Sequence, residues 1–315
     1  MKDVYELKWK PFDAGSLAVS SASGVFLWRL NLRANMNTPI RPSTLYSPQT
    51  WIQKDIKNVS AMDWSPCGTL LYITTKSDSK VVIWDVAKEF TTVLSLGSPW
   101  DVYYRSKSTI TSLMSKNSTA IVQDPSPKGT KKIKISRSGL FLAQLLNSGE
   151  LYVFDLQTST KHFCQGGISS FCWINSTVLL YMKGPSALHI VQLTKTENKL
   201  RVREMRGQTS FEVIGGSSPD TRVLDVAIDP SWQRLVIHTT DNIGLYSLSY
   251  QPLVRIDPIG LVKRHEEKPV KFAWASQFKD GALLSVVFSS GKVLFVPCML
   301  KEPTKGSFQF GGLVM

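Results

Sequence analysis

Hydrophobic and polar residues alternate along short runs of this chain, and turn-forming residues separate the runs. The stretch Val59–Val86 holds three such runs, the last of which ends in Trp84-Asp85-Val86. A period of two is typical of β-strands. Ser65-Pro66-Cys67-Gly68 lies between the first two runs, and Pro suits the second position of a type I turn while Gly suits the fourth. The stretch therefore predicts three strands of one small sheet.

The same strand-turn-strand pattern recurs in six units. Their approximate bounds are 4–30, 59–96, 131–165, 168–193, 222–256 and 270–298. Equivalent positions near the end of each first strand are Trp9, Trp64, Ile135, Trp173, Ile228 and Trp274, separated by 55, 71, 38, 55 and 46 residues. A repeat of this kind that ends in Trp-Asp predicts an all-β, WD-type β-propeller with six recognisable four-stranded blade units. We expect one domain over residues 1–300, followed by a tail over residues 301–315.

Burial explains why such units should stack. Runs such as Val81-Val82-Ile83-Trp84 are apolar on both faces of their strand. A small sheet cannot hide two apolar faces unless a neighbouring sheet covers each of them. The pattern therefore favours a radial array of sheets.

Four of the intervals exceed the roughly 40–45 residues that a blade needs. We expect the surplus to form surface connections, because it is rich in Pro, Ser, Asn or Lys. Part of each surplus should be the fourth strand of a blade, for example Thr91–Leu96. The four surplus segments are Asn31–Asn58, Gly97–Thr130, Thr194–Thr221 and Asp257–Lys268.

Cysteine usage and hydropathy narrow the class of protein. The four cysteines, Cys67, Cys164, Cys172 and Cys298, form no C-x-x-C pair, which favours a reducing compartment and free thiols. The first residues, MKDVYELKWKP, lack the apolar core of a signal peptide. No run approaches the roughly 20 apolar residues that cross a bilayer, so we expect any membrane contact to be indirect.

The formal net charge of +13 raises the question of an anionic partner. Two segments that read as loops, Arg105–Arg137 and Lys195–Arg206, carry net charges of +7 and +3. Solvated surface charge is the favoured interpretation. The basic KGTKKIK at Lys128–Lys134 leaves nuclear localisation or contact with RNA open, although Ile133 and Lys134 should already belong to a strand.

No motif predicts chemistry. His162, Cys164 and Cys172 lack a fourth metal ligand, and His189 and His238 lie in apolar runs where packing explains them. The sequence has no G-x-S-x-G elbow and no glycine-rich loop in a phosphate-binding context. We expect Trp84 to pack between blades and Asp85 to accept hydrogen bonds from turn donors. The predicted protein is not an enzyme and has no catalytic, cofactor-binding or metal-binding residues.

Aromatic residues in the long connections are candidate anchors for protein partners. These aromatic residues could equally well cap the blades, and both interpretations stay open. Three Ser-Pro dipeptides, at Ser98, Ser126 and Ser218, are candidate sites of proline-directed phosphorylation. The four aromatic candidates are Trp51, Trp100, Tyr103 and Tyr104.

Several of these segments resemble the aladin family of WD-repeat nucleoporins. The resemblance is carried by Leu7–Leu30, by VSAMDWSPCGTLLYITT and VVIWDV within Val59–Val86, and by Phe278–Pro297. It implies a non-enzymatic, seven-bladed propeller of the nuclear pore complex that needs no cofactor or metal. It also implies attachment at the nuclear envelope through a transmembrane nucleoporin and support of nucleocytoplasmic transport.

The chain departs from that family at both ends. Family members carry one further blade ahead of the unit that begins here at Val4, and they continue past Met315. We therefore expect an incomplete or strained ring, and the alternative is that six blades close on themselves. Two other functions stay open on the residues alone: a different WD-type adaptor, such as a substrate receptor of a ubiquitin ligase, and a basic propeller that binds RNA or phosphoinositide.

Overall fold

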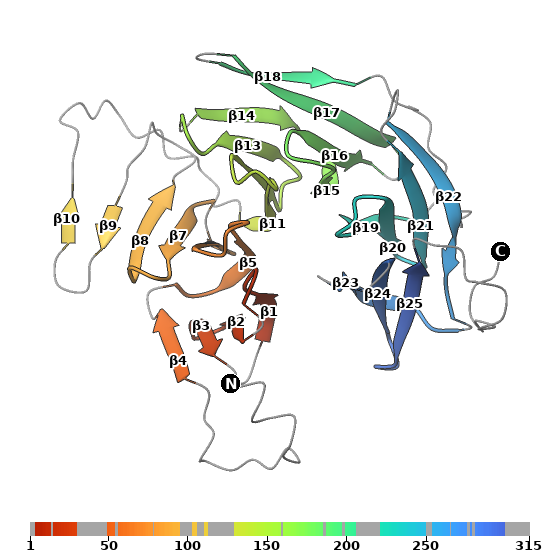
Figure 1. Cartoon of the computed structure of the whole chain (residues 1–315), viewed down its shortest axis with the longest axis horizontal. Coiled ribbons are helices and arrows are strands. Elements are labelled where there is room, and N and C mark those ends of the chain that lie inside the picture. The colour runs from red at the N-terminus through yellow and green to blue at the C-terminus, as the bar shows by residue number, and fades with distance from the viewer. Residues whose placement is uncertain are drawn as a thin grey trace, which may run out of the picture. The chain divides into compact units, whose positions relative to one another are not determined.

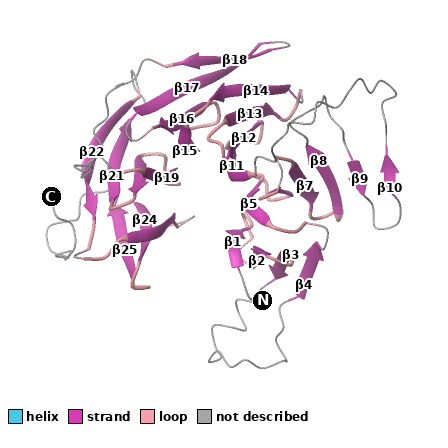
Figure 2. Cartoon of the chain, turned by 180° about the vertical axis from the view of Figure 1, so that it is seen from behind, coloured by secondary structure: helices cyan, strands magenta, loops and turns pink. Residues whose placement is uncertain are grey.

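The computed structural model of the chain contains only β-strands as regular elements among the residues that it describes (Figures 1 and 2). No helix in the described part is long and apolar enough to span a membrane. The described residues are 4–13, 15–29, 49–53, 56–77, 79–94, 103–105, 110–112, 129–158, 160–184, 187–196, 199–205, 221–249, 254–264, 266–275, 278 and 281–299.

The strands form six antiparallel sheets, numbered 1 to 6 here in chain order, in two compact units. Unit 1 spans Met1–Gly166 and holds sheets 1 to 3. Sheet 1 consists of β1 (Val4–Trp9), β2 (Ser16–Ser21), β3 (Gly24–Arg29) and β4 (Gln49–Gln53). Sheet 2 consists of β5 (Val59–Trp64), β6 (Leu70–Thr75), β7 (Val81–Asp85), β8 (Phe90–Leu94), β9 (Tyr103–Arg105) and β10 (Ile110–Ser112). Sheet 3 consists of β11 (Thr130–Ile135), β12 (Phe141–Leu146), β13 (Leu151–Asp155) and β14 (Thr160–Gln165).

Unit 2 spans Gly167–Met315 and holds sheets 4 to 6. Sheet 4 consists of β15 (Ile168–Trp173), β16 (Val178–Lys183), β17 (Ala187–Thr196) and β18 (Lys199–Glu204). Sheet 5 consists of β19 (Val223–Ile228), β20 (Arg234–Thr239), β21 (Ile243–Ser249) and β22 (Arg255–Val262). Sheet 6 consists of β23 (Pro269–Trp274), β24 (Gly281–Phe288) and β25 (Val293–Met299).

The first strand of every sheet carries an irregularity at the same place. The register between the first and second strands shifts after the opening residue of the first strand, as a β-bulge does. The six residues aligned in the sequence each end one of these first strands, so the alignment of the units is confirmed strand by strand. The shifts lie at Val4/Glu6, Val59/Ala61, Thr130/Lys132, Ile168/Ser170, Val223/Asp225 and Pro269/Lys271.

Neighbouring sheets pack face to face within each unit. Trp84 is 3% exposed and lies in a cluster that joins sheets 1 and 2, as the sequence predicts. Ile133 and Phe154 of sheet 3 pack against Tyr72 of sheet 2 in a second cluster. In unit 2, one cluster joins sheets 4 and 5, and another joins sheets 5 and 6. The expected burial of both faces through stacking is therefore seen for sheets 2 and 5, each of which packs against two neighbouring sheets of its unit.

The turns also follow the sequence. The Gly68 N–H donates to the Ser65 carbonyl at 2.9 Å, and Gly68 has a φ of 72°. An added Cβ at Gly68 would lie 2.9 Å from the Pro11 carbonyl oxygen, so Gly is required there. The Asp85 carboxylate accepts the Lys88 N–H at 3.1 Å, which is the predicted role of a turn acceptor.

Several expectations about the connections are wrong. Sheet 2 has six strands, whereas four were expected. Sheet 6 has three strands in the described residues, which leave the expected fourth strand untested. The segment Gly97–Thr130 contributes β9 and β10, although it was expected to be a surface connection. The basic segment that begins at Lys195 was read as a loop, yet it forms the hairpin of β17 and β18. Charged residues on both strands of this hairpin obscured the alternation of apolar and polar residues that predicts a strand.

Core burial yields a test of the stacking. Leu71 is 0% exposed between sheets 1 and 2, whereas Leu7 on β1 is 55% exposed. Leu71→Ala should lower the free energy of unfolding by about 2–5 kcal/mol, because it leaves a cavity in a packed core. Leu7→Ala is the matched control and should change it by less than about 1 kcal/mol. Chemical denaturation measures both variants, and equal effects would contradict the packing.

Candidate functional site

The residues that could have suggested a metal site do not form one in the described structure. His162 and Cys164 lie on β14 and Cys172 lies on β15, and the side chain of Cys164 is outside the description. The described residues contain no group of three or more His, Cys, Asp or Glu placed to hold a metal. In the part of the chain that the structure describes, Cys67, Cys172 and Cys298 form no disulfide bond.

The two strand histidines are held by packing. His238 is 4% exposed, packs edge-on against Phe272, and its Nε2 lies 3.1 Å from the Pro269 carbonyl oxygen. His189 stacks on Tyr181 with ring centroids 5.1 Å apart, and its Nδ1 lies 2.7 Å from a Glu204 oxygen. The prediction that both are packed side chains is confirmed.

Other candidates lie partly outside the described residues. Trp51 is on β4, and Tyr103 and Tyr104 are on β9, but their side chains are outside the description, as is Trp100 entirely. The three Ser-Pro dipeptides, at Ser98, Ser126 and Ser218, are also outside it. Their roles as anchors or phosphorylation sites stay predictions.

A network of charged groups joins the first strands of unit 1. The Glu6 carboxylate on β1 accepts the backbone N–H of Met62 on β5. Asp63 on β5 accepts the backbone N–H of Ile135 on β11 at 3.0 Å. Sequence reasoning missed these ties, because 56 residues separate Glu6 from Met62 and 72 separate Asp63 from Ile135. A carboxylate on one sheet therefore holds the backbone of the next sheet.

Two lysines complete this network. Lys134 Nζ lies 3.3 Å from Asp63 Oδ1, and Lys8 Nζ lies 3.2 Å from Glu6 Oε1. The Asp63 carboxylate raises the pKa of Lys134 above its usual value and outweighs the opposing effect of burial. The positive charge of Lys134 lowers the pKa of Lys8, and burial lowers it further. Lys134 is therefore paired with Asp63 within the fold. The exposed part of the basic segment Lys128–Lys134 is shorter by this residue, as predicted.

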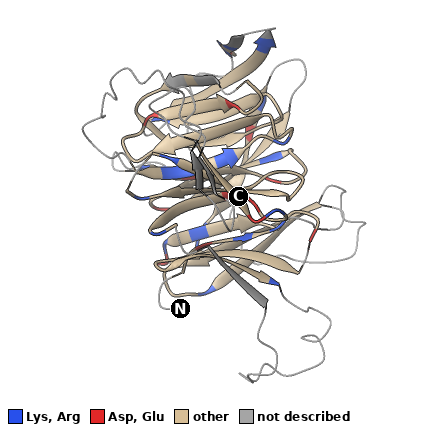
Figure 3. Cartoon of the chain, turned by 90° about the vertical axis from the view of Figure 1, so that its left-hand side faces the viewer, with Lys and Arg blue, Asp and Glu red and all other residues tan. Residues whose placement is uncertain are grey.

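Unit 2 uses a related tie between its first strands. The Ser170 hydroxyl on β15 donates to Asp225 Oδ1 on β19 at 2.8 Å and accepts the Val226 N–H at 3.3 Å. Ser170 occupies the same place in its strand as Glu6 does in β1, two residues after the strand begins. Positively and negatively charged residues lie within strands in several sheets (Figure 3). These polar groups connect neighbouring sheets within each unit.

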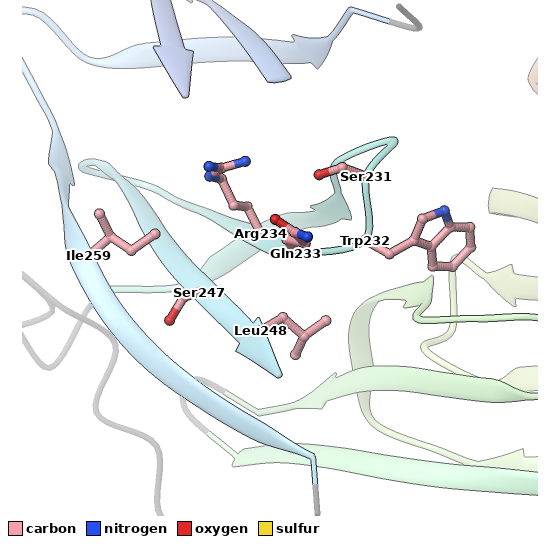
Figure 4. A pocket seen from close by; sticks show the side chains of 7 residues that line it. All are labelled: Ser231, Trp232, Gln233, Arg234, Ser247, Leu248 and Ile259. Carbon is pink, nitrogen blue, oxygen red and sulfur yellow. The ribbon is translucent and has the colours of Figure 1, made fainter. Parts of the chain in front are cut away.

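A pocket of about 560 Å³ opens in unit 2 beside sheet 5 (Figure 4). The side chain of Arg234 is 13% exposed, and its Nη1 lies 3.7 Å from Oδ2 of the fully buried Asp229. Arg234 Nη2 donates to the Met299 carbonyl at 2.8 Å. Because Asp229 neutralises Arg234, charge at this pocket does not favour an anionic ligand. The lining residues are Ser231, Trp232, Gln233, Arg234, Ser247, Leu248 and Ile259.

Trp232 has a backbone conformation that is unusual for its size. In four sheets the turn after the first strand closes with the same bond, in which the fourth residue's N–H donates to the first residue's carbonyl. In three of them the fourth residue has a positive φ. That fourth residue is Gly68 in sheet 2, Gly139 in sheet 3 and Trp232 in sheet 5, with φ values of 72°, 73° and 64°. A bulky residue with positive φ is strained by about 1–3 kcal/mol. The Trp232 indole points away from the Arg234 guanidinium (Figure 4).

Cys67 is an exposed thiol with a perturbed pKa. Its Sγ lies 3.3 Å from the Ser65 hydroxyl and 3.0 Å from the Thr69 hydroxyl. Hydrogen bonds from Ser65 and then Thr69 lower the pKa of Cys67 to about 7. No titratable partner for general-base catalysis adjoins it in these contacts. Exposure and a lowered pKa both favour the thiolate, which is the nucleophilic form of this side chain.

The sheets and their stacking define the class of protein, an all-β propeller of the WD-repeat type. Two solved structures share this fold at 13% identity and a TM-score of 0.51 each. One is the β-propeller domain of Cps50 (Swd1) from Myceliophteria thermophila, with 94% of this chain and 96% of that chain covered. The other is the N-terminal domain of Nup159, with 91% of this chain and 72% of that chain covered.

Among curated proteins, the chain resembles aladin of Arabidopsis thaliana. The two are 22% identical over 325 residues, which cover 96% of this chain and 67% of the relative. No protein-family model matches the sequence. The resemblance that the segments Leu7–Leu30 and Phe278–Pro297 indicate is therefore confirmed across nearly the whole chain.

The charged network can be tested at Asp63. Asp63→Ala removes the acceptor of the Ile135 N–H and the partner of Lys134, so we expect it to lower the free energy of unfolding by about 1–3 kcal/mol. The side chain of Lys134 is 35% exposed, so solvent screening limits the loss. Asp257→Ala is the control, because Asp257 pairs with Arg255 at the exposed surface. Chemical denaturation should show less than about 1 kcal/mol for the control, and a silent Asp63→Ala would refute the network's role.

The thiol of Cys67 predicts a pH profile. With a pKa of about 7, its alkylation rate by iodoacetamide should rise through pH 7 and level off above it, because the thiolate is the nucleophile. Thr69→Ala removes one hydrogen bond to sulfur and should move the midpoint upward. Cys298 is an internal control, since burial raises its pKa. Mass spectrometry of each cysteine measures the rates, and a Cys67 midpoint near that of a free thiol would contradict the geometry.

Proposed function

We propose that the chain is a non-enzymatic scaffold that docks in the nuclear pore complex at the nuclear envelope through protein–protein contacts. In this role it supports nucleocytoplasmic transport. The observation that carries the proposal is the alignment with aladin over 96% of the chain. A propeller fold alone is shared by proteins of many functions, so the fold supports a scaffold without specifying its partner.

The described structure is consistent with a rigid platform. Carboxylates tie successive first strands in unit 1, and a serine and an aspartate do so in unit 2. Such ties fix the sheets relative to their neighbours inside each unit, so that connecting segments can present contacts from a stable base. We propose that residues 1–300 form one propeller with 301–315 as its tail. That the ring is incomplete or strained stays a prediction.

We propose that the partners are a transmembrane nucleoporin and other nuclear pore proteins. Protein contact suits the exposed apolar side chains, among them Phe12 at 92%, Phe295 at 62% and Val270 at 56% exposure. Single exposed apolar side chains are normal on a protein surface, and they are compatible with contact to protein partners of complementary shape. The anchoring to the envelope is then indirect, through the partner.

A nucleic-acid or phosphoinositide role remains the alternative to test. Arg201 and Arg203 are exposed on β18, the last strand of sheet 4. They lie two residues apart and therefore on one face of the strand. Binding through such residues would weaken steeply with salt, because it depends on neutralising phosphates.

The proposal is tested by proximity labelling of the tagged full-length chain in cells. We expect nuclear pore and nuclear envelope proteins to be enriched, and capture of these partners to resist RNase and moderate salt. The charge-reversed variant Arg201→Glu with Arg203→Glu should retain the same partners, since protein contacts rather than phosphate contacts carry the binding. Leu71→Ser, which disrupts a buried position, should lose them.

Three outcomes would count against the proposal. Enrichment of ubiquitin-ligase subunits or other cytosolic machinery without envelope proteins would favour a different adaptor. Loss of capture in the charge-reversed variant would favour a nucleic-acid role if RNase also abolishes it. Flotation of the wild-type chain with anionic liposomes, lost in that variant, would favour phosphoinositide binding.

A further inference from the structure

The polar ties between first strands follow one rule. An oxygen of one sheet accepts a backbone N–H of the sheet that follows it in the chain. Glu6 and Ser170 are each the first residue after the bulge of their strand, and they accept the N–H groups of Met62 and Val226. Met62 and Val226 also share one place, the second residue after the bulge. The tie is therefore a repeated feature of the packing between sheets.

A second tie has the same direction. Asp63, the third residue after the bulge of β5, accepts the Ile135 N–H of β11 at 3.0 Å and pairs with Lys134 at 3.3 Å. Ile135 is the fourth residue after its own bulge. A following sheet thus offers N–H groups at the second and fourth residues after the bulge, and the preceding sheet supplies the oxygen atoms.

Sheet 1 has the same donors without acceptors. The second and fourth residues after the bulge of β1 are Leu7 and Trp9. The Lys10 N–H donates to the Ser16 carbonyl on the β2 side at 2.9 Å, so the N–H groups of Leu7 and Trp9 point to the other side of β1. That side is the end of sheet 1, and no described residue accepts either N–H group there.

The side chains beside these donors form an exposed apolar face. Leu7 and Trp9 are 55% and 51% exposed, whereas Met62 and Trp64 at the same places in sheet 2 are 1% and 5% exposed. Met62 and Trp64 are buried because they pack in the cluster that joins sheets 1 and 2. The Trp64 indole Nε1–H also donates to the Lys8 carbonyl of sheet 1 at 3.2 Å. Leu7 and Trp9 therefore present the kind of surface by which sheet 2 binds the sheet before it.

The polar ties indicate what can cover this face. A second copy of the chain, joined head to tail, would place its last sheet, sheet 6, in front of sheet 1. Sheet 6 carries Lys271 and Ala273 as the first and third residues after its bulge. Neither side chain accepts a hydrogen bond, and Lys271 would add positive charge near Lys8. The net charge of +13 also opposes association of two copies. The observations favour a sheet from a different protein.

We propose that the face of sheet 1 formed by Leu7 and Trp9 docks a β-sheet of a partner protein, whose first strand presents a carboxylate to this face. The carboxylate accepts the Trp9 N–H and pairs with the ammonium group of Lys8, as Asp63 does for sheet 3. Lys8 occupies the same place after the bulge as the lysine that pairs with Asp63, and its side chain is 26% exposed. The proposal concerns the chemistry of the contact and does not depend on the partner being a nuclear pore protein.

Photo-cross-linking in cells tests the proposal. Leu7 of the tagged full-length chain is replaced by p-benzoylphenylalanine, and mass spectrometry identifies the peptide that is cross-linked on irradiation. We expect a β-strand segment of another protein, with Asp or Glu on the cross-linked strand. The same replacement at Leu224 is the matched control, because Leu224 on β19 is also exposed, at 43%, and lies outside this face. The control should not form that product.

Charge exchange tests the carboxylate. With the purified partner, Lys8→Glu should weaken binding at least about tenfold, because two like charges then meet in the contact. Replacing the partner's acidic residue by Lys should restore the binding. Lys88→Glu is the control, since Lys88 is 79% exposed and lies outside this face, and it should leave the affinity unchanged. Leu7→Asp changes a residue that is exposed in the chain alone, so it tests the face even if Lys8→Glu unfolds, and it should also weaken binding.

Each contrary result would overturn the proposal. Cross-links from position 7 to the chain itself, to a second copy or to nucleic acid would assign the face to that occupant. A cross-linked segment without an acidic residue, or an affinity that neither Lys8→Glu nor Leu7→Asp changes, would refute the predicted contact. A cross-link to a nuclear pore protein would support both this proposal and the proposed function. A cross-link to a strand of an unrelated protein would support this proposal and count against that function.

Discussion

Each sheet of this protein is apolar on both faces, and the rest of the structure depends on covering those faces. Ala18 and Val25 of sheet 1 pack towards sheet 2, while Leu7 and Trp9 on the other side are 55% and 51% exposed. A sheet inside a unit finds a neighbour on each side, as sheets 2 and 5 do. Small sheets of this kind gain their stability from their neighbours, as the units of repeat proteins do.

Apolar packing does not by itself fix how one sheet sits against the next. Charged and polar groups of the first strands supply that information, because a carboxylate that accepts a backbone N–H has a defined direction and distance. Asp63 fixes Ile135 in this way, and Ser170 fixes Val226. These groups also explain why charged residues occupy strands that the burial argument alone would make apolar. Once paired, the charges add specificity of packing while they cost desolvation.

The sequence was sufficient to predict the sheets that combine alternation with glycine turns. Gly68 and Gly139 mark their turns in the sequence and have the positive φ that favours glycine. Prediction failed where charge obscured alternation: Leu200-Arg201-Val202-Arg203 has the period of a strand, but its basic content suggested a loop. The ties at Asp63 could not be predicted, since they join residues 72 positions apart and depend on register. The positive φ of Trp232 could not be predicted either, because no residue type in its turn indicates it.

Proline shows how the third strand of sheet 6 differs from those of the other sheets. The third strands β3, β7, β13, β17 and β21 contain no proline, and each bonds to strands on both sides. Proline lacks the N–H that such a strand needs, so it is normally confined to edges and bulges, as Pro258 is beside the bulge in β22. The Leu283 carbonyl accepts the Ala275 N–H on the β23 side, so its partner Pro297 faces away from β24. Pro297 therefore removes one donor from the side of β25 that no described strand covers. A strand that paired with this edge would form one hydrogen bond fewer than it would beside a third strand without proline, a loss of about 1 kcal/mol.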